Sequence, residues 1–315
     1  MKILIVGLGS VGAIHGWALS QSGADISHVV RKGSLARYSG GVKMDVLDMR
    51  GDLPEHYITS YVPRVVEEPV PGEGYGLVLV ATNHLQAASA VGQYRELVPE
   101  ADFLMFTANW EGTGEIDALL PRSRYLWGFS VSSGGRDRDG VLYANIQKQF
   151  RIGEVDGSCT PRLDRIIETF ERAGFVPDIK ANIIEWQWVH HAINAGVIGT
   201  ALYMGGLPEE DTGIEVWMLM VRAVKDALAV LEKRGVDVRS YTDTRPFFVR
   251  DEEEAARRFR QMLLSMPHYE RTKTCSHFNT SPEEMKRFYL DVLETGERLG
   301  VPMPYLGSLK EGVCR

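Results

Sequence analysis

Cysteine is scarce in this chain of 315 residues, and the three that occur, Cys159, Cys275 and Cys314, lie far apart. No Cys-x-x-Cys pair and no cysteine–histidine pairing with metal-ligand spacing is present. This pattern argues against a disulfide framework and against a zinc site, because both need closely patterned ligands. We therefore expect no bound metal and reduced thiols in a reducing compartment, which favours a cytoplasmic location.

The chain also lacks the features of a membrane or nucleic-acid protein. No apolar run approaches the ~18 residues of a spanning helix, and we expect no signal sequence at the start. The net charge of −7 argues against nucleic acid or an anionic membrane as a partner, since both require a basic surface. The length suits two globular domains.

The strongest positive signal lies at the start, where an apolar run ending at Val6 is followed by glycines in G-x-G-x-x-G spacing and a helical pattern. Strand, glycine turn and helix in this order predict a Rossmann dinucleotide site. The first glycine permits the tight turn, the second lets the backbone approach a pyrophosphate, and the third lets the helix pack closely on the strand. The predicted cofactor-binding residues are Gly7, Gly9, Ser10, Val11 and Gly12.

Two cations follow the second predicted strand, residues 26–30. Arg31 and Lys32 stand where an NAD site usually carries an acid that accepts from the ribose hydroxyl. Cations at this position fit a 2′-phosphate, so the pattern favours NADP(H) over NAD. The alternative is a solvated basic turn.

Two further apolar runs, residues 77–82 and 103–107, predict buried parallel strands that end close to Asn83 and Asn109. At such a strand end Asn109 can hydrogen-bond a nicotinamide or a substrate oxygen, or it can simply be a turn residue. The lone His15 and His84 are interpreted as structural or surface groups.

The remaining pattern divides the chain into an α/β half and a helical half. Residues 141–144 and 150–152 predict antiparallel strands at the sheet edge, and residues 161–172 a helix. Further helices are predicted at 183–203, 216–234, 252–266 and 282–299. We expect an N-terminal Rossmann-type doubly wound sheet (1–179, NADP-binding) and an all-helical C-terminal domain (180–315, substrate binding and dimerisation). A cleft between them is expected to hold the substrate.

Three polar or aromatic residues share one face of the helix predicted at 183–203. Trp186, His190 and Asn194 are spaced i, i+4, i+8, whereas His191 points roughly 100° away. A histidine and an asparagine one turn apart could polarise and protonate a carbonyl oxygen. The alternative is a buried histidine that is only satisfied by hydrogen bonds.

Together these features resemble the ketopantoate reductase (2-dehydropantoate 2-reductase) family. The segments that carry the resemblance are GLGSVG, VVRKGS, LVLVATNHLQ, TANWEGTGEI and WVHHAINAGVIGTAL. The resemblance implies an NADP-dependent oxidoreductase of pantothenate biosynthesis, with Asn109, Trp188 and Asn194 at positions that match the family. Apolar surface on the helical domain favours a homodimer.

Two family lysines are replaced in this chain. Asn83 stands at one lysine position, with Gln86 kept, and His190 stands where the catalytic lysine belongs, so His190 becomes the candidate proton donor. Ile198 also replaces a family asparagine. These departures point away from ketopantoate itself and toward another small 2-oxo acid or related carbonyl.

The family's substrate-site glutamate matches Glu284, and its serine matches Thr272, with Thr274 or Ser276 as alternatives. Ser281 to Glu284 also form a capping-box pattern, which alone would explain Glu284. The sequence thus predicts catalytic residues His190, Asn194 and Glu284, and substrate contacts from Asn109, Asn194, Thr272, Ser276 and Glu284. Asn83 and Asn109 join the cofactor site.

Two rival functions remain open. One is an opine-type or imine-reducing dehydrogenase, which shares this layout and is favoured by the missing lysines. The other is a non-catalytic NADP-binding sensor protein.

Overall fold

The computed structural model describes residues 1–314, except for the side chain of His277. The chain divides into two compact units, Met1–Ile184 and Glu185–Arg315. The first is α/β and the second is helical, as the sequence predicts.

The first unit is built on an eight-stranded sheet. Its strands are β1 (Lys2–Val6), β2 (Asp25–Val29), β5 (Arg64–Val66), β6 (Leu77–Val80), β7 (Asp102–Phe106), β8 (Tyr125–Ser130), β11 (Gln149–Gly153) and β12 (Val176–Ile179). They lie in the order β12-β11-β8-β7-β6-β1-β2-β5. The six strands from β5 to β8 are parallel and have the strand order of a Rossmann fold, so their carboxyl ends meet at one edge. β11 runs antiparallel to β8, as predicted, but it is not at the edge, because β12 pairs with it in parallel on the other side.

Helices connect these strands. They are α1 (Ser10–Gln21), α2 (His84–Tyr94), α3 (Gly114–Asp117) and α4 (Pro161–Arg172), with 3₁₀ turns η1 (Leu35–Tyr38) and η2 (Arg122–Arg124). Helix α4 has the bounds that the sequence predicts. Its cap residue Thr160 accepts from the Leu163 N–H, and Pro161 occupies the first turn, where no N–H is needed.

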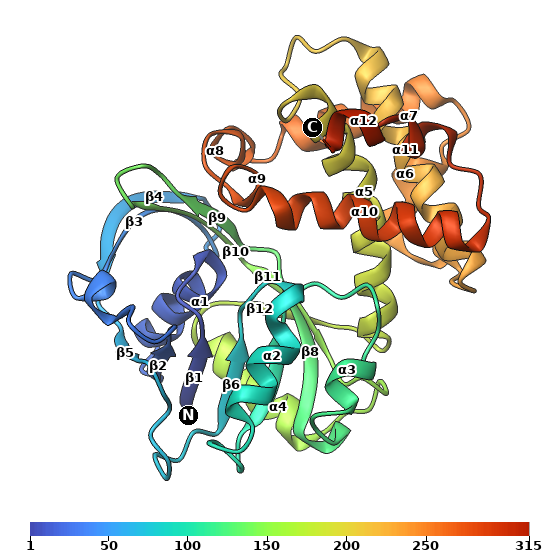
Figure 1. Cartoon of the computed structure of the whole chain (residues 1–315). Coiled ribbons are helices and arrows are strands. Elements are labelled where there is room, and N and C mark those ends of the chain that lie inside the picture. Colours follow the sequence, from blue (N-terminus) through green and yellow to red (C-terminus); the bar gives the residue numbers. More distant parts are fainter. Residues whose placement is uncertain (315) are drawn as a thin grey trace. The chain divides into compact units, whose positions relative to one another are not determined.

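A second sheet of four strands covers α1 (Figure 1). Its strands, β3 (Val42–Met49), β4 (Glu55–Tyr61), β9 (Ser133–Arg136) and β10 (Leu142–Gln147), lie in the order β4-β3-β10-β9. The inner side chains Val42, Met44, Leu142 and Ile146 join the core that contains β1 and α1. The prediction that residues 141–144 extend the main sheet is therefore wrong, because this strand pairs with β3 and β9 instead.

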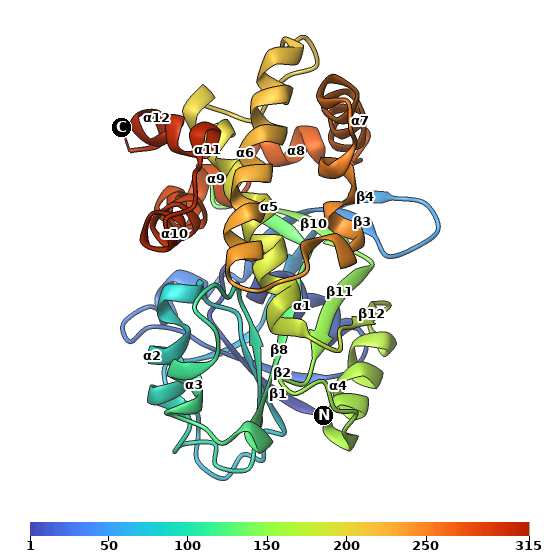
Figure 2. The same ribbon diagram turned by 90° about the vertical axis from the view of Figure 1, so that its right-hand side faces the viewer.

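The second unit consists of helices, and Figure 2 shows α6 beside α7, α10 and α11. Its helices are α5 (Ile183–Met204), which begins two residues before the division, α6 (Ile214–Lys233), α7 (Glu252–Leu264), α8 (Tyr269–Thr274), α9 (His277–Thr280), α10 (Pro282–Leu299), α11 (Pro304–Ser308) and α12 (Lys310–Val313), with 3₁₀ turns η3 (Val238–Ser240) and η4 (Thr242–Phe248). Trp217, Val221 and Leu228 of α6 are fully buried. No helix in residues 1–314 is both long and apolar enough to cross a bilayer.

Candidate functional site

The three glycines of the first turn each have a separate geometry. Gly7 has φ +95°, and its N–H donates to the Val29 carbonyl at 2.9 Å, which ties the turn to β2. Gly9 is exposed, and a Cβ there would meet nothing within 4 Å. A Cβ on Gly12 would lie 2.6 Å from the Gly7 carbonyl oxygen. The turn and packing roles predicted for Gly7 and Gly12 are therefore present in the fold, and Gly9 leaves open space above the backbone.

The N-terminus of α1 carries an uncompensated partial positive charge. Its first N–H groups, from Ser10 to Gly12, have no acceptor within the helix. Gly9 supplies no side-chain cap, and the first turn contains no acidic residue. Such a helix start favours an anion. The residues at this turn thus fit the pyrophosphate of a dinucleotide.

Arg31 and Lys32 lie at the carboxyl end of β2, and both are exposed. Neither side chain makes a hydrogen bond or ion pair within residues 1–314, so both charges are available to a ligand. The backbone N–H groups of Gly33 and Ser34, directly after them, donate to the carboxylate of Glu67. The sequence analysis missed Glu67, which follows the three-residue strand β5 and lies at the same edge.

Unsatisfied polar atoms occur at the end of β6, which pairs with β1. Asn83 precedes α2, but its side chain makes no cap hydrogen bond. The Oδ1 atom of Asn83 and the Oγ1 atom of Thr82 are buried without a hydrogen-bond partner among the described residues. Because buried polar atoms are nearly always paired, these two atoms suit a site that receives a polar ligand.

Asn109 closes its own loop. Its Oδ1 accepts from the Gly112 N–H at 2.8 Å, and its Nδ2 donates to the Gly112 carbonyl at 2.9 Å. Asn109 therefore has the geometry of a turn residue, which is the alternative interpretation given above. A cofactor or substrate contact from Asn109 stays a prediction.

A histidine that the sequence analysis did not single out fixes the glycine turn. His28 of β2 donates from Nδ1 to the Gly7 carbonyl at 2.9 Å, and its Nε2 accepts from the Tyr61 hydroxyl at 2.9 Å. Burial lowers the pKa of His28 to about 4, so the ring is neutral, as this bonding pattern requires. Gly16 leaves room for the ring, since a Cβ there would lie 2.4 Å from Nε2.

The polar face of α5 is assembled as the spacing predicts. The ring of His190 stacks on Trp186 with centroids 5.2 Å apart and an interplanar angle of 15°. The Nδ2 atom of Asn194 donates to His190 Nε2 at 2.8 Å. Trp186 donates to Asp243 at 2.9 Å. His190 is thus held from both sides along the helix, with Nε2 as an acceptor.

Two of the other histidines, His191 and His15, have structural surroundings. His191 is buried, stacks on Phe288 with centroids 4.4 Å apart, and lies 3.4 Å from a carboxylate oxygen of Asp291. His15 contacts Ser130 at 2.8 Å and packs against Phe106; burial lowers its pKa to about 3. His84 is the half-buried first residue of α2.

The substrate residues predicted near the end of the chain lie on α8 to α10. Thr272 donates to the His268 carbonyl within its helix, and buried Ser276 accepts from the Phe278 N–H. Glu284 is half-buried in the first turn of α10. The predicted capping box is wrong, because Ser281 makes no side-chain cap hydrogen bond. A substrate role for Thr272, Ser276 and Glu284 stays a prediction.

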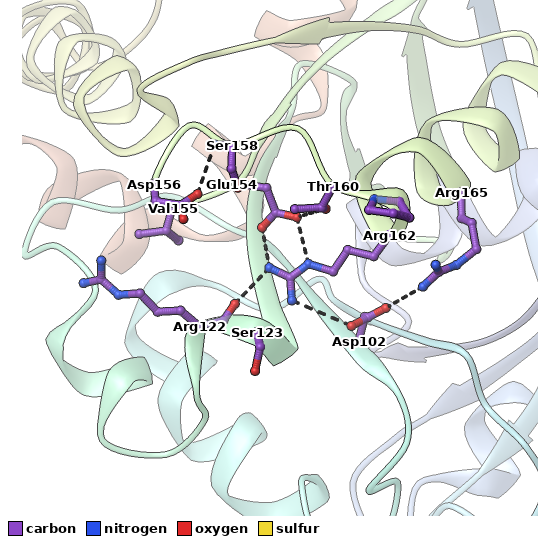
Figure 3. A pocket seen from close by; sticks show the side chains of 11 residues that line it. Asp102, Arg122, Ser123, Glu154, Val155, Asp156, Ser158, Thr160, Arg162 and Arg165 are labelled. Carbon is purple, nitrogen blue, oxygen red and sulfur yellow. Dashed lines mark hydrogen bonds and ion pairs between the residues drawn. The ribbon is translucent and has the colours of Figure 1, made fainter.

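A cavity of about 530 Å³ lies at the opposite, amino-terminal edge of the sheet. Figure 3 shows Arg162 paired with Glu154 and facing Asp102, which also pairs with Arg165. These charges largely neutralise one another. Among residues 1–314 no group of three or more histidine, cysteine or acidic side chains is placed to hold a metal ion.

The fold and its glycine turn define the class of the protein: it has the fold of NAD(P)-dependent oxidoreductases that pair a Rossmann-type unit with a helical one. Residues 3–157 match the family model described as "Ketopantoate reductase PanE/ApbA". Over this range the chain is similar to the ketopantoate reductase family, as its motifs predict.

Individual relatives are distant. The 2-dehydropantoate 2-reductase of Pyrococcus horikoshii is 22% identical over 241 residues, which cover 75% of each chain. A solved 2-dehydropantoate 2-reductase from Geobacter metallireducens has a TM-score of 0.71 at 17% identity, with 99% of each chain covered. D-Mandelate dehydrogenase, solved with NADH and anilino(oxo)acetate, has a TM-score of 0.72 at 14% identity, with 100% of this chain and 97% of its own covered. At these identities the structures establish a shared fold.

Proposed function

We propose that this protein is an NADP(H)-dependent reductase that converts a small 2-oxo acid, or a related carbonyl compound, to the hydroxy compound. The observation that carries the proposal is the uncapped glycine turn of α1 beside two unpaired cations, in a chain similar to the ketopantoate reductase family. D-Mandelate dehydrogenase, which has the same fold, is named for a 2-hydroxy acid, and this supports the substrate class.

Residues of the first unit would hold the cofactor. The N–H groups from Ser10 to Gly12 suit the pyrophosphate, and Arg31 and Lys32 suit the 2′-phosphate. Asn83 offers a buried Oδ1 acceptor that lacks a partner in the described chain. NADPH, when bound, supplies a hydride to the carbonyl carbon.

His190 would supply the proton that the carbonyl oxygen takes up. In the neutral ring the donation from Asn194 to Nε2 leaves the proton on Nδ1. Proton transfer to the carbonyl oxygen would start from the imidazolium form, with the Asn194 amide turned so that its Oδ1 accepts from Nε2–H, and would leave a neutral ring. Trp186 holds the plane of the ring. The protein then contributes position and one proton transfer, which is the share of the reaction expected when a cofactor carries the hydride.

A steady-state assay tests this function. We expect NADPH oxidation with at least one member of a panel of aliphatic and aromatic 2-oxo acids. His190→Ala should lower kcat/KM by roughly 10²- to 10⁴-fold, the usual contribution of a positioned acid. His56→Ala, which removes an exposed histidine of β4, should leave it unchanged. An unchanged kcat/KM in His190→Ala contradicts the assignment of the acid.

The missing lysines favour a second candidate. With Asn83 and His190 in place of two cations, the site suits an imine as well as a 2-oxo acid. An opine-type or imine-reducing dehydrogenase would oxidise NADPH only when an amine or amino acid is added with the carbonyl compound. A protein that binds NADPH tightly but turns over with no compound tested would instead be the sensor of our third hypothesis.

We also propose that the protein is cytoplasmic and forms a homodimer. Exposed apolar side chains on the helical unit, Tyr203, Met204 and Tyr305, support self-association. Sedimentation equilibrium measures the mass in solution, and a monomer at micromolar concentration contradicts this part of the proposal.

A further inference from the structure

Arg136, the last residue of β9, is a partly buried cation without an acidic partner. Burial lowers the pKa of its guanidinium below the usual arginine value. The positive charge of Arg37 acts in the same direction, while Tyr38 opposes it. Within residues 1–314 Arg136 makes no ion pair, and its hydrogen bonds all go to backbone carbonyls. A cation that has lost water without gaining a counter-charge is unfavourable in the protein alone.

The acid next to Arg136 in sequence is already engaged. The Oδ1 atom of Asp137 accepts from the Asp139 N–H at 3.0 Å and the Val141 N–H at 2.9 Å, which closes the β9–β10 hairpin. The hairpin thus holds Arg136 at the end of its strand and leaves its charge unneutralised.

Arg136 reaches the glycine turn from the second sheet. Its Nη2 atom donates to the Leu8 carbonyl at 3.1 Å, and Leu8 lies between Gly7 and Gly9. Its Nη1 atom donates to the Gly140 carbonyl at 3.2 Å. A guanidinium has five N–H donors, so three remain for a ligand. The unpaired charge therefore lies beside the turn that suits a dinucleotide phosphate.

We propose that Arg136 binds a phosphate of the dinucleotide, together with the N-terminus of α1. This inference rests on the proposed function. Two phosphates of the same ligand have the required chemistry. The hydrogen bond to the Leu8 carbonyl favours the pyrophosphate, because Leu8 belongs to the glycine turn. The charge of Arg37, which acts on Arg136 and follows Arg31 and Lys32 in the chain, favours the 2′-phosphate. The sequence analysis did not single out Arg136 as a ligand-binding residue.

The test compares binding of NADPH, NADH and adenosine by calorimetry in wild type, Arg136→Gln and Arg136→Lys. Arg138→Gln is the matched control, because Arg138 lies on the same hairpin and is exposed. We expect Arg136→Gln to weaken NADPH binding about 10- to 100-fold, the usual effect of losing a charge-assisted hydrogen bond. Arg136→Lys should lose less, and Arg138→Gln and adenosine binding should change little.

The two phosphates give different results. Equal losses for NADPH and NADH assign Arg136 to the pyrophosphate, and a loss confined to NADPH assigns it to the 2′-phosphate. Unchanged binding in Arg136→Gln, or an equal loss of adenosine binding, overturns the inference and leaves the proposed function intact. A wild-type protein that binds neither dinucleotide overturns both. If Arg136→Gln does not fold, Arg136→Met, which also removes the charge and keeps a long side chain, decides in the same way.

Discussion

Two parts of the proposed site can be predicted from the sequence: the glycine turn of the first unit and the polar face of α5 in the second unit. They differ in whether backbone or side chains form the site. At the turn the backbone forms the site, so the absence of side chains at Gly9 and Gly12 already fixes the shape that a ligand meets. On α5 the spacing fixes only that Trp186, His190 and Asn194 lie in one row. Their chemistry depends on side-chain identity, which the helical spacing does not specify.

The difference suggests that changes at the packed positions of the turn should affect folding and binding together, whereas changes on α5 should affect turnover alone. Three measurements in the first unit can sharpen or break this distinction.

The largest effect is expected from Gly12→Ala. The added Cβ would lie 2.6 Å from the Gly7 carbonyl oxygen, so the turn must move. We expect a loss of about 1–3 kcal/mol in the free energy of unfolding and at least a 100-fold weaker binding of NADPH. Urea denaturation and calorimetry measure the two quantities.

Gly9→Ala is the control, because the position is open and a Cβ there meets nothing within 4 Å. It should leave the free energy of unfolding nearly unchanged but weaken NADPH binding, since the methyl group occupies the approach of the phosphate. If both variants lose stability equally, the turn is not organised in the way described.

An intermediate effect is expected from pH. The pKa of His28 lies at about 4 in the folded protein, below the value near 6.5 of an unfolded chain. Between these values the unfolded state binds the proton and the folded state does not, so stability falls as the pH is lowered. Between pH 7 and pH 5 we expect the titration of His28 to lower the free energy of unfolding by about 2 kcal/mol.

Urea denaturation at the two pH values measures this loss. His28→Gln should make the pH dependence shallower than in wild type, with the remainder due to other groups such as His15. An identical pH dependence in the variant would show that His28 does not titrate in this way.

The smallest effect is expected from Glu67→Gln. The Glu67 carboxylate is bonded to the N–H groups after Arg31 and Lys32, so it places a negative charge near the proposed 2′-phosphate site. Its removal should raise the affinity for NADPH relative to NADH by about 3- to 10-fold, a modest change because the site is solvated. Glu68→Gln, a change at the exposed neighbouring residue, is the control. An unchanged ratio in Glu67→Gln places the adenosine phosphate elsewhere.

Much of the fold could be predicted because its signals are local. The buried strands β1, β6 and β7 are continuous apolar runs, and α4 and α10 begin with proline in the first turn. Such patterns need no knowledge of the partner element.

The second sheet could not be predicted in the same way. Strand β3 alternates buried residues with exposed or half-buried ones over its first six positions, and it pairs in parallel with β10, about a hundred residues away. The contacts of Arg136, His28 and Glu67 with the turns that follow β1 and β2 also depend on distant pairings, so no local pattern distinguishes these residues.

The space that Gly16 leaves for His28 also has an evolutionary consequence. A methyl group at position 16 and an imidazole at position 28 exclude each other, because the Cβ would lie 2.4 Å from Nε2. Related sequences that carry alanine at position 16 should therefore carry a residue smaller than histidine at position 28. The Tyr61 hydroxyl would then lack its acceptor, so we expect tyrosine to be absent from position 61 in the same sequences. The three positions are expected to covary as one unit.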